Sequence, residues 1–296
     1  MGILRMFKVL IASRRLFSNW LSAGIRYYLV KHSMIKGGIT VKCSNRKYAL
    51  SPRVYSSIVN AYYDGAFEEL ECHDSLYAVF TYKGQKIRFC DSFEFLNDIV
   101  FENFIGGAYD DIDVSNRVVI DVGAGVGDTA ILFALRGAKK VIALEPFPSL
   151  YKKALINIKI NGVEDRVSLI NAGLGSFNGE VYAELSDIHD YYLFKPAGKS
   201  DAKVKIYTLN SLIREFEIEK GSILKMDCEG CEYETILNAK PEDLMIFEQI
   251  VIEYHDGYME LRKVLEDAGF EIVIKPMKSI QQPVKKQGYI VARRKT

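Results

Sequence analysis

From residue 116 onward, short apolar runs alternate with helical patterns, and this alternation limits the folds open to the chain. The apolar runs are RVVIDVG (117–123), KVIALEP (140–146), VSLINAG (167–173), ILKMDCE (223–229), QIVIEYH (249–255), EIVIKPM (271–277) and YIVARR (289–294). Stretches with helical spacing lie between most of these runs, at 128–137, 147–162, 207–217, 233–239 and 258–269. Near-continuous Val, Ile and Leu runs mark strands buried on both faces, and their alternation with helices is typical of a doubly wound sheet. We therefore expect an α/β, Rossmann-like fold with a mostly parallel seven-stranded sheet.

The chain divides into three predicted parts. Residues 1–36 form a basic amphipathic helical segment, residues 37–110 an N-terminal α+β cap, and residues 111–296 the domain that contains the sheet. Within the cap, the patterns predict a strand in GGITVKC (37–43), a helix in SPRVYSSIVNAYYDG (51–65), a hairpin that turns at Lys83-Gly84, and a helix in SFEFLNDIVFENFIGG (92–107). The regular rhythm breaks between residues 175 and 205, where GEVYAEL and AKVKIY predict a small antiparallel insertion.

Positive charge is concentrated at the start of the chain, where residues 1–63 contain eleven Lys or Arg and no Asp or Glu. Apolar residues recur there at helical spacing, at Leu4, Phe7, Leu10, Phe17, Leu21, Ile25 and Tyr28. Two interpretations stay open. The apolar face lies on an anionic membrane or docks an anionic partner, with Trp20 as an interfacial anchor, or it packs on the protein's own domain.

The sequence predicts no membrane-spanning helix, because no window reaches the roughly 18–20 uninterrupted apolar residues that a span needs. The five cysteines are an odd number, scattered, and preceded by no secretory cleavage pattern. We expect a cytoplasmic protein with mostly reduced cysteines. Peripheral contact with an anionic membrane through residues 1–35 is the alternative that the basic helix leaves open.

The first strand of the sheet leads into a glycine-rich turn, DVGAGVGDTA, with Gly123, Gly125 and Gly127 spaced two apart. A dinucleotide fingerprint needs its last two glycines three apart, and a P-loop needs a following Gly-Lys-Ser/Thr, so neither pattern is met. A tight turn remains that lets a ligand approach the backbone, with Asp121 supplying a carboxylate.

A second carboxylate, Glu145, ends the next strand, where an acid accepts hydrogen bonds from two ribose hydroxyls in nucleotide-binding folds. Asp121 and Glu145 suit a ligand with a ribose and a cationic amino acid part, which describes S-adenosylmethionine (SAM). Asn171 on the third strand either presents its amide to adenine or stabilises a turn. The predicted cofactor contacts are Asp121, Gly123, Ala124, Gly125, Asp128, Glu145, Pro146, Asn171 and Asp227.

These residues resemble the FkbM family of SAM-dependent methyltransferases. The matching segments are VVIDVGAGVGDTAILFALRGAKKVIALEPFPSLYKKALINIKING, TLNSL, LKMDCEGCEYETIL and VIEYH, which span roughly residues 100–275 in this order. The resemblance implies a class I methyltransferase fold and methylation of a hydroxyl on a sugar or natural product. The sequence departs from the family pattern at Asn210, where Asp is common, and at the two cysteines of the acidic loop.

That acidic loop, LKMDCEGCEYE (224–234), contains a CxxC spacing at Cys228 and Cys231. A structural zinc would need a second ligand pair, and a thioredoxin-like motif would open the helix after an early strand and lack flanking acids, so we favour the acids over a redox or metal role. Asp227 is placed to orient the acceptor or to act as base, and Glu229 to hydrogen-bond the acceptor or the cofactor's ammonium. Glu232 is expected to be a helix-capping or solvated acid.

The fifth strand ends in IVIEYHDG, which places His255 on the same rim as Asp227. His255 is either a general base or a histidine that satisfies a turn, and Glu253 anchors the rim or pairs with an acceptor hydroxyl. The cluster could hold a divalent cation, but no spacing demands one, so no metal site is predicted. Tyr109 either closes over the cofactor or packs in the core. The predicted catalytic residues are Asp227, Glu229 and His255.

The sequence therefore predicts a SAM-dependent methyltransferase that modifies a hydroxyl of a sugar, glycolipid or related metabolite. One alternative is an RNA methyltransferase, since the basic segment could bind phosphates, although the acidic remainder would repel a polyanion. Another is a non-catalytic SAM-binding or scaffold protein.

Overall fold

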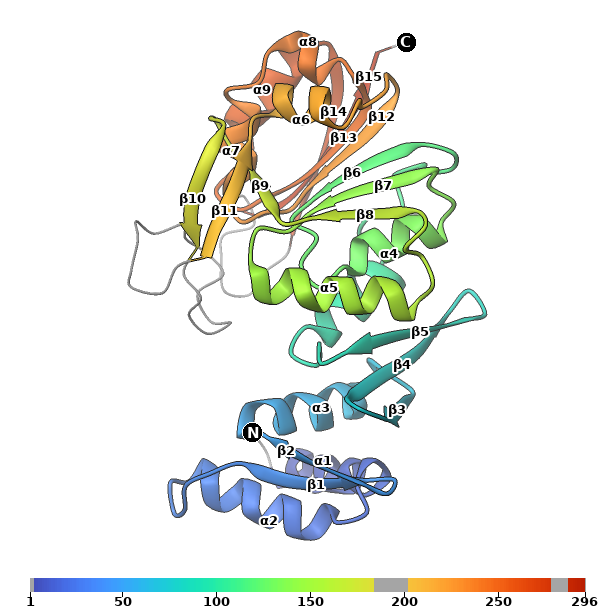
Figure 1. The fold of residues 1–296 in the computed structure, drawn as a ribbon, viewed down its shortest axis with the longest axis vertical. Helices are drawn as coiled ribbons and strands as arrows, with labels where there is room; N and C mark the ends of the chain where they lie inside the picture. The colour runs from blue at the N-terminus through green and yellow to red at the C-terminus, as the bar shows by residue number, and fades with distance from the viewer. Residues whose placement is uncertain (1–2, 184–201, 278–286, 296) are drawn as a thin grey trace. The chain divides into compact units, whose positions relative to one another are not determined.

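The computed structural model describes residues 3–183, 202–277 and 287–295. The chain forms two compact units, Met1–Ala108 and Tyr109–Thr296, so the predicted parts 1–36 and 37–110 lie in one unit. Figure 1 labels the helices and strands of each unit.

The unit Tyr109–Thr296 is built on a seven-stranded sheet of order β14-β15-β13-β12-β6-β7-β8. Its strands are β6 (Val118–Val122), β7 (Lys140–Leu144), β8 (Val167–Ile170), β12 (Ser222–Met226), β13 (Phe247–Tyr254), β14 (Phe270–Pro276) and β15 (Gly288–Arg294). Only the pairings of β15, with β13 and with β14, are antiparallel. The predicted α/β fold with a mostly parallel seven-stranded sheet is confirmed.

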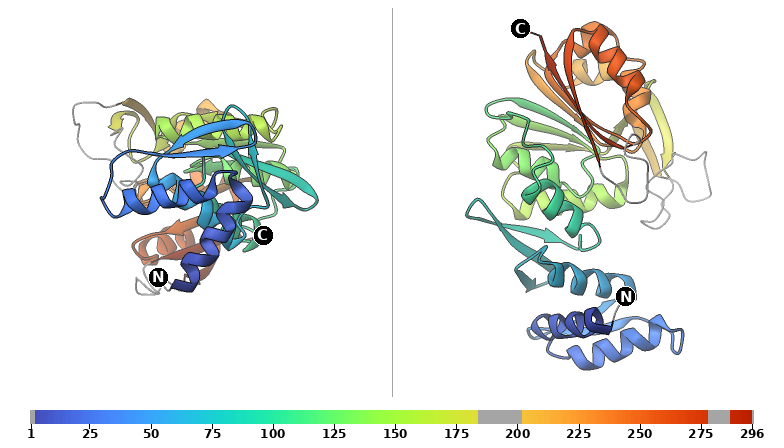
Figure 2. Two further views of the ribbon diagram at one scale, coloured as in Figure 1. Left: turned by 90° about the horizontal axis from the view of Figure 1, so that it is seen from below. Right: turned by 180° about the vertical axis from the view of Figure 1, so that it is seen from behind.

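Helices cover both faces of this sheet (Figures 1 and 2). The helices are α4 (Asp128–Leu135), α5 (Pro148–Ile160), α6 (Leu209–Glu215), α7 (Cys231–Ile236), α8 (Pro241–Leu244) and α9 (Met259–Asp267). α4 and α5 lie against one face, and α6, α7 and α9 lie against the other. Every residue of β6 and β12 is buried, as expected for central strands with helices on both sides.

The register aligns the carboxyl ends of the central strands. Val122 of β6 pairs with Leu144 of β7 and Met226 of β12, and Met226 pairs with Ile252 of β13. The loops that follow these strands therefore emerge at one edge of the sheet, which is where open α/β sheets bind their ligands.

The predicted antiparallel insertion is present as β10 (Gly179–Ala183) and β11 (Ala202–Tyr207). Strand β11 also pairs in parallel with β9 (Ala172–Leu174), which forms a separate three-stranded sheet. The run 167–173 was predicted as one strand, and this was wrong, because the chain leaves β8 at Asn171 to enter the second sheet.

The unit Met1–Ala108 combines helices with two small sheets, β1-β2 and β3-β4-β5. Its elements are α1 (Ile3–Leu16), α2 (Trp20–Lys31), β1 (Ile39–Cys43), β2 (Arg46–Leu50), α3 (Pro52–Asp64), β3 (Glu69–Cys72), β4 (Leu76–Tyr82), β5 (Gln85–Cys90) and the π-helix η1 (Asp98–Ile105). Helix α3 has Pro52 in its first turn as predicted, and the β4-β5 hairpin turns at Lys83 and Gly84, both at positive φ. The helix expected over 92–107 is shorter than predicted.

The apolar positions predicted as one stripe on the first two helices separate in the structure. Phe17 is buried and stacks on Tyr55 of α3, with 6.0 Å between ring centroids, whereas Leu21, Ile25 and Tyr28 are exposed. The prediction that the helices pack on their own protein thus holds for Phe17 and not for α2's outer face. Within the described residues, no helix is long and apolar enough to cross a membrane.

Four of the five cysteines form disulfides, so the expectation of mostly reduced cysteines was wrong. Cys43 pairs with Cys72, and Cys228 pairs with Cys231; Cys90 is free and buried. The first pair joins β1 to β3 across 29 positions, with its Cα atoms 6.0 Å apart. Sequence spacing could not reveal it, because the proximity of these strands is a property of the fold.

Candidate functional site

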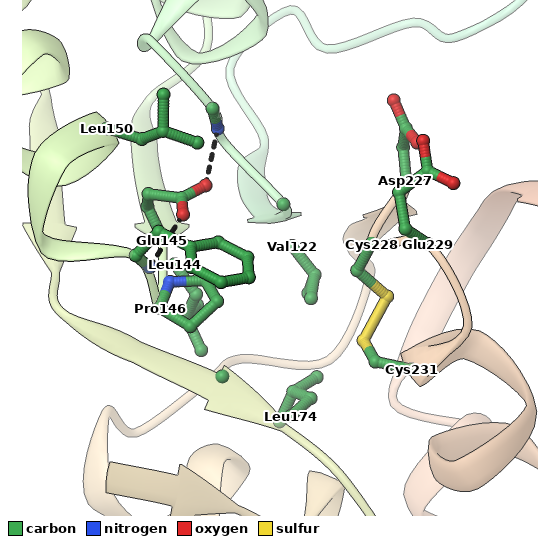
Figure 3. Close-up of a pocket in the computed structure, with 14 residues that line it drawn as sticks. Val122, Leu144, Glu145, Pro146, Leu150, Leu174, Asp227, Cys228, Glu229 and Cys231 are labelled. Atoms are coloured by element: carbon green, nitrogen blue, oxygen red, sulfur yellow. Dashed lines mark hydrogen bonds between the residues drawn. A yellow bond between two sulfur atoms is a disulfide. The ribbon is translucent and has the colours of Figure 1, made fainter. Parts of the chain in front are cut away.

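A pocket lies at the carboxyl ends of β6, β7 and β12 (Figure 3). Its lining consists of Val122, Gly123, Gly125, Leu144, Glu145, Pro146, Phe147, Leu150, Gly173, Leu174, Asp227, Cys228, Glu229 and Cys231. Apolar side chains form one part of the wall, and Glu145 and Asp227 stand on opposite sides of the pocket. A mostly apolar lining with a few directed polar groups is typical of small-molecule and cofactor sites.

The glycine loop closes against the loop that follows β12. Gly123 has φ of 78°, and a Cβ there would collide with the backbone carbonyl oxygen of Asp227. The amides of Gly123 and Ala124 both donate to the carbonyl of Leu144, at 3.0 Å each. Position 123 therefore requires glycine for two reasons, its left-handed backbone and the close approach of the neighbouring loop.

Glu145 braces the glycine loop from the end of β7. Its Oε2 accepts from the Gly125 amide at 2.8 Å, and its Oε1 accepts from the Phe147 amide at 2.8 Å. Burial raises the pKa of Glu145 to about 8, against the opposing effect of these two amides. Each carboxylate oxygen has a second lone pair, so Glu145 retains the capacity to accept ligand hydroxyls.

Asp121 forms a buried ion pair that the sequence analysis missed. Its Oδ1 lies 2.9 Å from Nζ of Lys225 on β12, and its Oδ2 accepts from the Thr129 hydroxyl at 2.6 Å. Lys225 also donates to the carbonyl of Gly123 at 3.1 Å. Burial disfavours the charged lysine, but the carboxylates of Asp121 and Asp227 outweigh this effect and raise the pKa of Lys225.

This arrangement places the Asp121 side chain outside the pocket lining, where it anchors Lys225 and, through it, the glycine loop. The signal that could have revealed the pair was a lysine inside the otherwise apolar strand ILKM, since a buried charge requires a partner.

A cluster of carboxylates surrounds His255, which follows β13. Its Nε2 lies 3.4 Å from Glu229 Oε2, 3.8 Å from Asp227 Oδ1 and 3.8 Å from Glu253 Oε1. The structure thus brings together the three predicted catalytic residues Asp227, Glu229 and His255, and it places Glu253 beside them.

The other ring nitrogen of this histidine, Nδ1, lies 3.0 Å from Oε1 of Glu232. Burial lowers the pKa of His255, but the hydrogen bond with Glu232 and the negative charges of Glu229 and Asp227 together raise it to about 9. Burial likewise raises the pKa of Glu229 to about 7, against the effect of His255.

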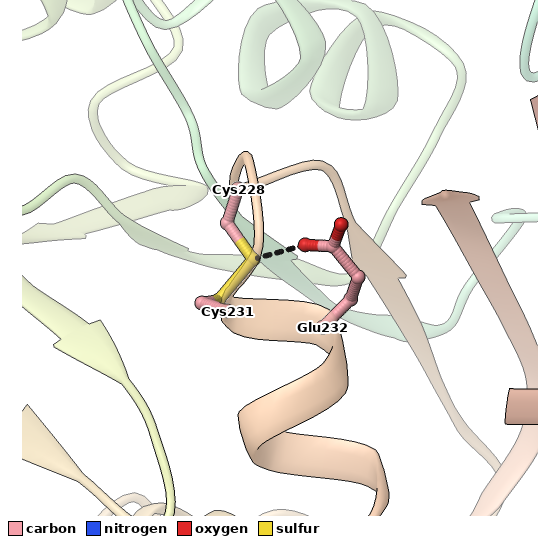
Figure 4. A group of neighbouring side chains, drawn as sticks. All are labelled: Cys228, Cys231 and Glu232. Carbon is pink, nitrogen blue, oxygen red and sulfur yellow. Dashed lines mark hydrogen bonds between the residues drawn. A yellow bond between two sulfur atoms is a disulfide. The ribbon is translucent and has the colours of Figure 1, made fainter. Parts of the chain in front are cut away.

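The prediction of a solvated Glu232 was wrong. The side chain is fully buried, and its Oε2 accepts from the Gly230 amide at 2.9 Å, which matches the capping alternative. Figure 4 shows the same oxygen near the Cys228–Cys231 disulfide, 3.3 Å from Cys228 Sγ. The first turn of α7 faces the end of β13, and this orientation depends on packing that the local sequence does not encode.

The Cys228–Cys231 disulfide closes the loop that carries Glu229, and both cysteines line the pocket. Glu229 has φ of 55° and Gly230 has φ of 120°, so the loop holds a non-glycine residue in the left-handed region. Such backbone conformations cost on the order of 1–3 kcal/mol and cluster at functional sites.

Ligand atoms of Asp227, Glu229 and His255 all lie within 4.8 Å of one another, a spacing that fits a divalent cation, although the sequence predicted no metal site.

Three other predicted residues are held by contacts with the protein. Asn171 donates its amide to the carbonyls of Glu145 and Pro146, at 2.8 and 3.0 Å, which corresponds to the turn-stabilising alternative. Ala124 is buried, and Asp128 begins α4. Contacts of these residues with a cofactor stay predictions.

Tyr109 is packed in the core. Its ring lies 5.8 Å from that of Phe133 and 5.9 Å from that of Tyr289, measured between centroids. The packed alternative therefore holds, and Tyr109 is not a lid over the pocket.

Comparison with known proteins gives a family match over residues 121–272, just over half of the 296-residue chain, to the methyltransferase FkbM domain. The hexuronic acid methyltransferase AglP of Haloferax volcanii is 26% identical over 153 residues, covering 51% of this chain and 62% of AglP. Ribosomal protein L11 methyltransferase of Carboxydothermus hydrogenoformans is 44% identical over 73 residues, which is 24% of each protein. The chain thus spans only about a quarter to three fifths of the length of these relatives.

Among solved structures, the FkbM methyltransferase of Methylobacillus flagellatus is 13% identical with a TM-score of 0.42, covering 68% of this chain and 54% of that one.

Proposed function

The chain belongs to the FkbM methyltransferase family, and from this premise we propose that it transfers a methyl group from SAM to a hydroxyl of a sugar, glycolipid or related metabolite. The observation that carries the proposal is the placement of a ribose-competent carboxylate, Glu145, and a carboxylate–histidine cluster around His255 at one edge of the sheet.

The cofactor side of the pocket fits SAM in three respects. Glu145 can accept ribose hydroxyls while it holds the glycine loop, because its oxygens keep free lone pairs. Leu144, Phe147 and Leu174 supply an apolar surface for adenine. Asp227 and Glu229 supply negative charge for the cofactor's ammonium. SAM would contribute an electrophilic methyl group on a sulfonium.

The acceptor side supplies hydrogen-bonding and proton-accepting groups. Carboxylates at Asp227, Glu229 and Glu253 accept hydrogen bonds from neighbouring hydroxyls, as a polyhydroxylated acceptor requires. His255 Nε2 takes the proton from the reacting hydroxyl, while the buried Glu232 keeps Nδ1 protonated and the ring oriented. Because the pKa of His255 is raised to about 9, the fraction of neutral base increases as the pH rises toward that value.

Two further points support a carbohydrate acceptor. AglP carries a hexuronic acid as the substrate in its name. The carboxylates around His255 would repel the phosphates of RNA, which disfavours the RNA methyltransferase alternative.

The first test is titration calorimetry of the purified protein with SAM, comparing wild type with Glu145→Ala and with Glu164→Ala, an exposed control. We expect Glu145→Ala to lose binding and Glu164→Ala to keep it. Absence of binding to the wild type would contradict the proposal. Asp121→Ala is unsuited to this test, because it leaves Lys225 buried without its counter-ion.

A second test concerns the reaction itself. Transfer of a labelled methyl group from SAM to hexoses and uronic acids should occur with the wild type, increase with pH up to about 9, and be lost in His255→Gln. Transfer to RNA but not to sugars would overturn the choice of acceptor. SAM binding without transfer to either would favour a non-catalytic SAM-binding protein.

A further inference from the structure

The outer face of α2 carries a row of exposed apolar side chains. Leu21, Ile25 and Tyr28 are 53%, 54% and 52% exposed, and their spacing of four and three residues places them on one side of the helix. We call these three residues the α2 apolar stripe. Helices of globular proteins usually turn such a stripe toward the core, whereas α2 turns Ala23 inward instead.

Basic residues border this stripe. Arg26 and Lys31 are exposed, and the 3.6-residue period of the helix places one on each side of the stripe. Arg26 is held in place by a hydrogen bond from Nε to the carbonyl of Gly38 at 2.6 Å. Further exposed cations follow at the end of α1 and after α2, at Arg14, Arg15 and Lys36.

The surrounding sequence contains no acid to neutralise these cations, since residues 1–63 lack Asp and Glu entirely. The segment therefore attracts anionic surfaces and repels a second copy of itself. This charge distribution identifies the kind of partner.

We propose that the α2 apolar stripe docks on an anionic lipid surface, with Leu21 and Ile25 among the acyl chains and the flanking cations at the headgroups. An exposed apolar face bordered by Lys and Arg is the pattern of helices that lie in the membrane interface. Tyr28 suits the boundary because its ring has an apolar body and a polar tip.

A polyanion such as RNA satisfies the pattern less well. It would engage the cations but leave Leu21 and Ile25 in water, so only a lipid surface uses both features of the helix. This docking is independent of the methyl transfer proposed above, and the two can be tested separately.

The test is sedimentation of the full chain with vesicles of phosphatidylcholine alone and with vesicles of equal parts phosphatidylcholine and phosphatidylserine. The stripe is removed in Leu21→Ser/Ile25→Ser. Its matched control is Leu155→Ser/Ile156→Ser, which removes two similarly exposed aliphatic side chains from α5. The charge arm compares Lys31→Glu with Lys152→Glu, an equal change of charge on α5.

We expect the wild type to bind the anionic vesicles and to dissociate as salt rises. The stripe variant and Lys31→Glu should each weaken binding on the order of tenfold, and the two control variants should leave it unchanged. A thermal midpoint of the stripe variant equal to that of its control is also expected, since the stripe is exposed.

Three results would overturn the proposal. One is absence of vesicle binding by the wild type, or binding that the stripe variant does not weaken. Another is binding to a short RNA that depends on Lys31 and not on the stripe. The third is a lowered thermal midpoint in the stripe variant alone, which would show that the stripe packs on the protein itself.

Discussion

At the scale of single residues, the buried Lys225–Asp121 pair decides whether the glycine loop is correctly held. Both side chains are almost fully excluded from water, and Lys225 also bonds the Gly123 carbonyl. Removal of one partner leaves an uncompensated charge, whereas removal of both leaves none. The pair is therefore best examined by comparing single and double variants.

Replacing Lys225 with Met should destabilise the fold by about 3–5 kcal/mol, because Asp121 keeps a buried charge without its ammonium. The double variant Asp121→Leu/Lys225→Met should be more stable than either single variant. Urea unfolding measures both. Lys139→Met, which breaks an exposed pair with Glu219, is the control and should change little. A double variant no better than the singles would contradict this interpretation.

The Glu232–His255 pair should give stability a pH dependence of known sign. The folded pKa of His255, about 9, lies above the ordinary value of 6.5, so the folded state binds the extra proton between these values. Its stabilising contribution is complete below about pH 6.5 and is lost as the pH rises through about 9.

Glu232→Gln should flatten that part of the stability profile and move the pKa of His255 toward its ordinary value. Urea unfolding across pH 6–10 and proton NMR titration of the histidine check the two expectations. An unchanged His255 titration in Glu232→Gln would show that the other carboxylates alone hold the proton.

The site residues that sequence predicted were those that directly follow a strand. Asp227 and His255 fall in this class, because the carboxyl ends of neighbouring parallel strands meet at one edge. Lys225 and Glu232 were missed or misjudged, since their roles depend on which neighbour the fold places opposite them. Asp121 was predicted as a direct ligand contact, and only its buried neighbour Lys225 shows that the carboxylate is already paired.

At the scale of elements, the turn between β6 and α4 and the loop after β12 are fitted to each other. Gly123→Ala should destabilise the protein by about 2–4 kcal/mol, combining left-handed strain with collision against the Asp227 carbonyl. Gly137→Ala is a matched control, because its φ of 90° is equally left-handed but nothing lies within 4 Å of the added Cβ. It should cost only about 1 kcal/mol. Equal losses in thermal unfolding would remove the steric argument.

The disulfide-closed loop between β12 and α7 should couple the redox state to the site. Reduction by a dithiol opens the Cys228–Cys231 bond to two thiols and oxidises the reagent to its cyclic disulfide. Glu229, held at a φ of 55°, can then relax away from His255. Methyl transfer should fall several-fold.

Cys228→Ser/Cys231→Ser should show the reduced level of activity with and without dithiol. The matched variant Cys43→Ser/Cys72→Ser removes the other disulfide and should keep the response to dithiol. A wild-type rate indifferent to reduction would contradict the coupling.

Elements with a strong local signal were predicted correctly. Helix α3 has Ser51 as its N-cap and Gly65 at its end, and the β4-β5 turn has its glycine at a left-handed position. The departure of the chain from β8 into a second sheet was not predictable, because nothing local distinguishes a strand that changes sheets at Asn171 from one that continues.

At the scale of the whole molecule, the sequence separation across the sheet has a consequence for protein synthesis. Strand β6 lies between β7, which follows it closely, and β12, whose Lys225 lies 102 positions after Gly123. At about 5–20 residues per second, a ribosome needs roughly 5–20 s to deliver that lysine after the glycines have emerged. During this interval a nascent chain cannot bury Asp121 beside its ammonium, so the early strands must wait for the later half before the sheet can close.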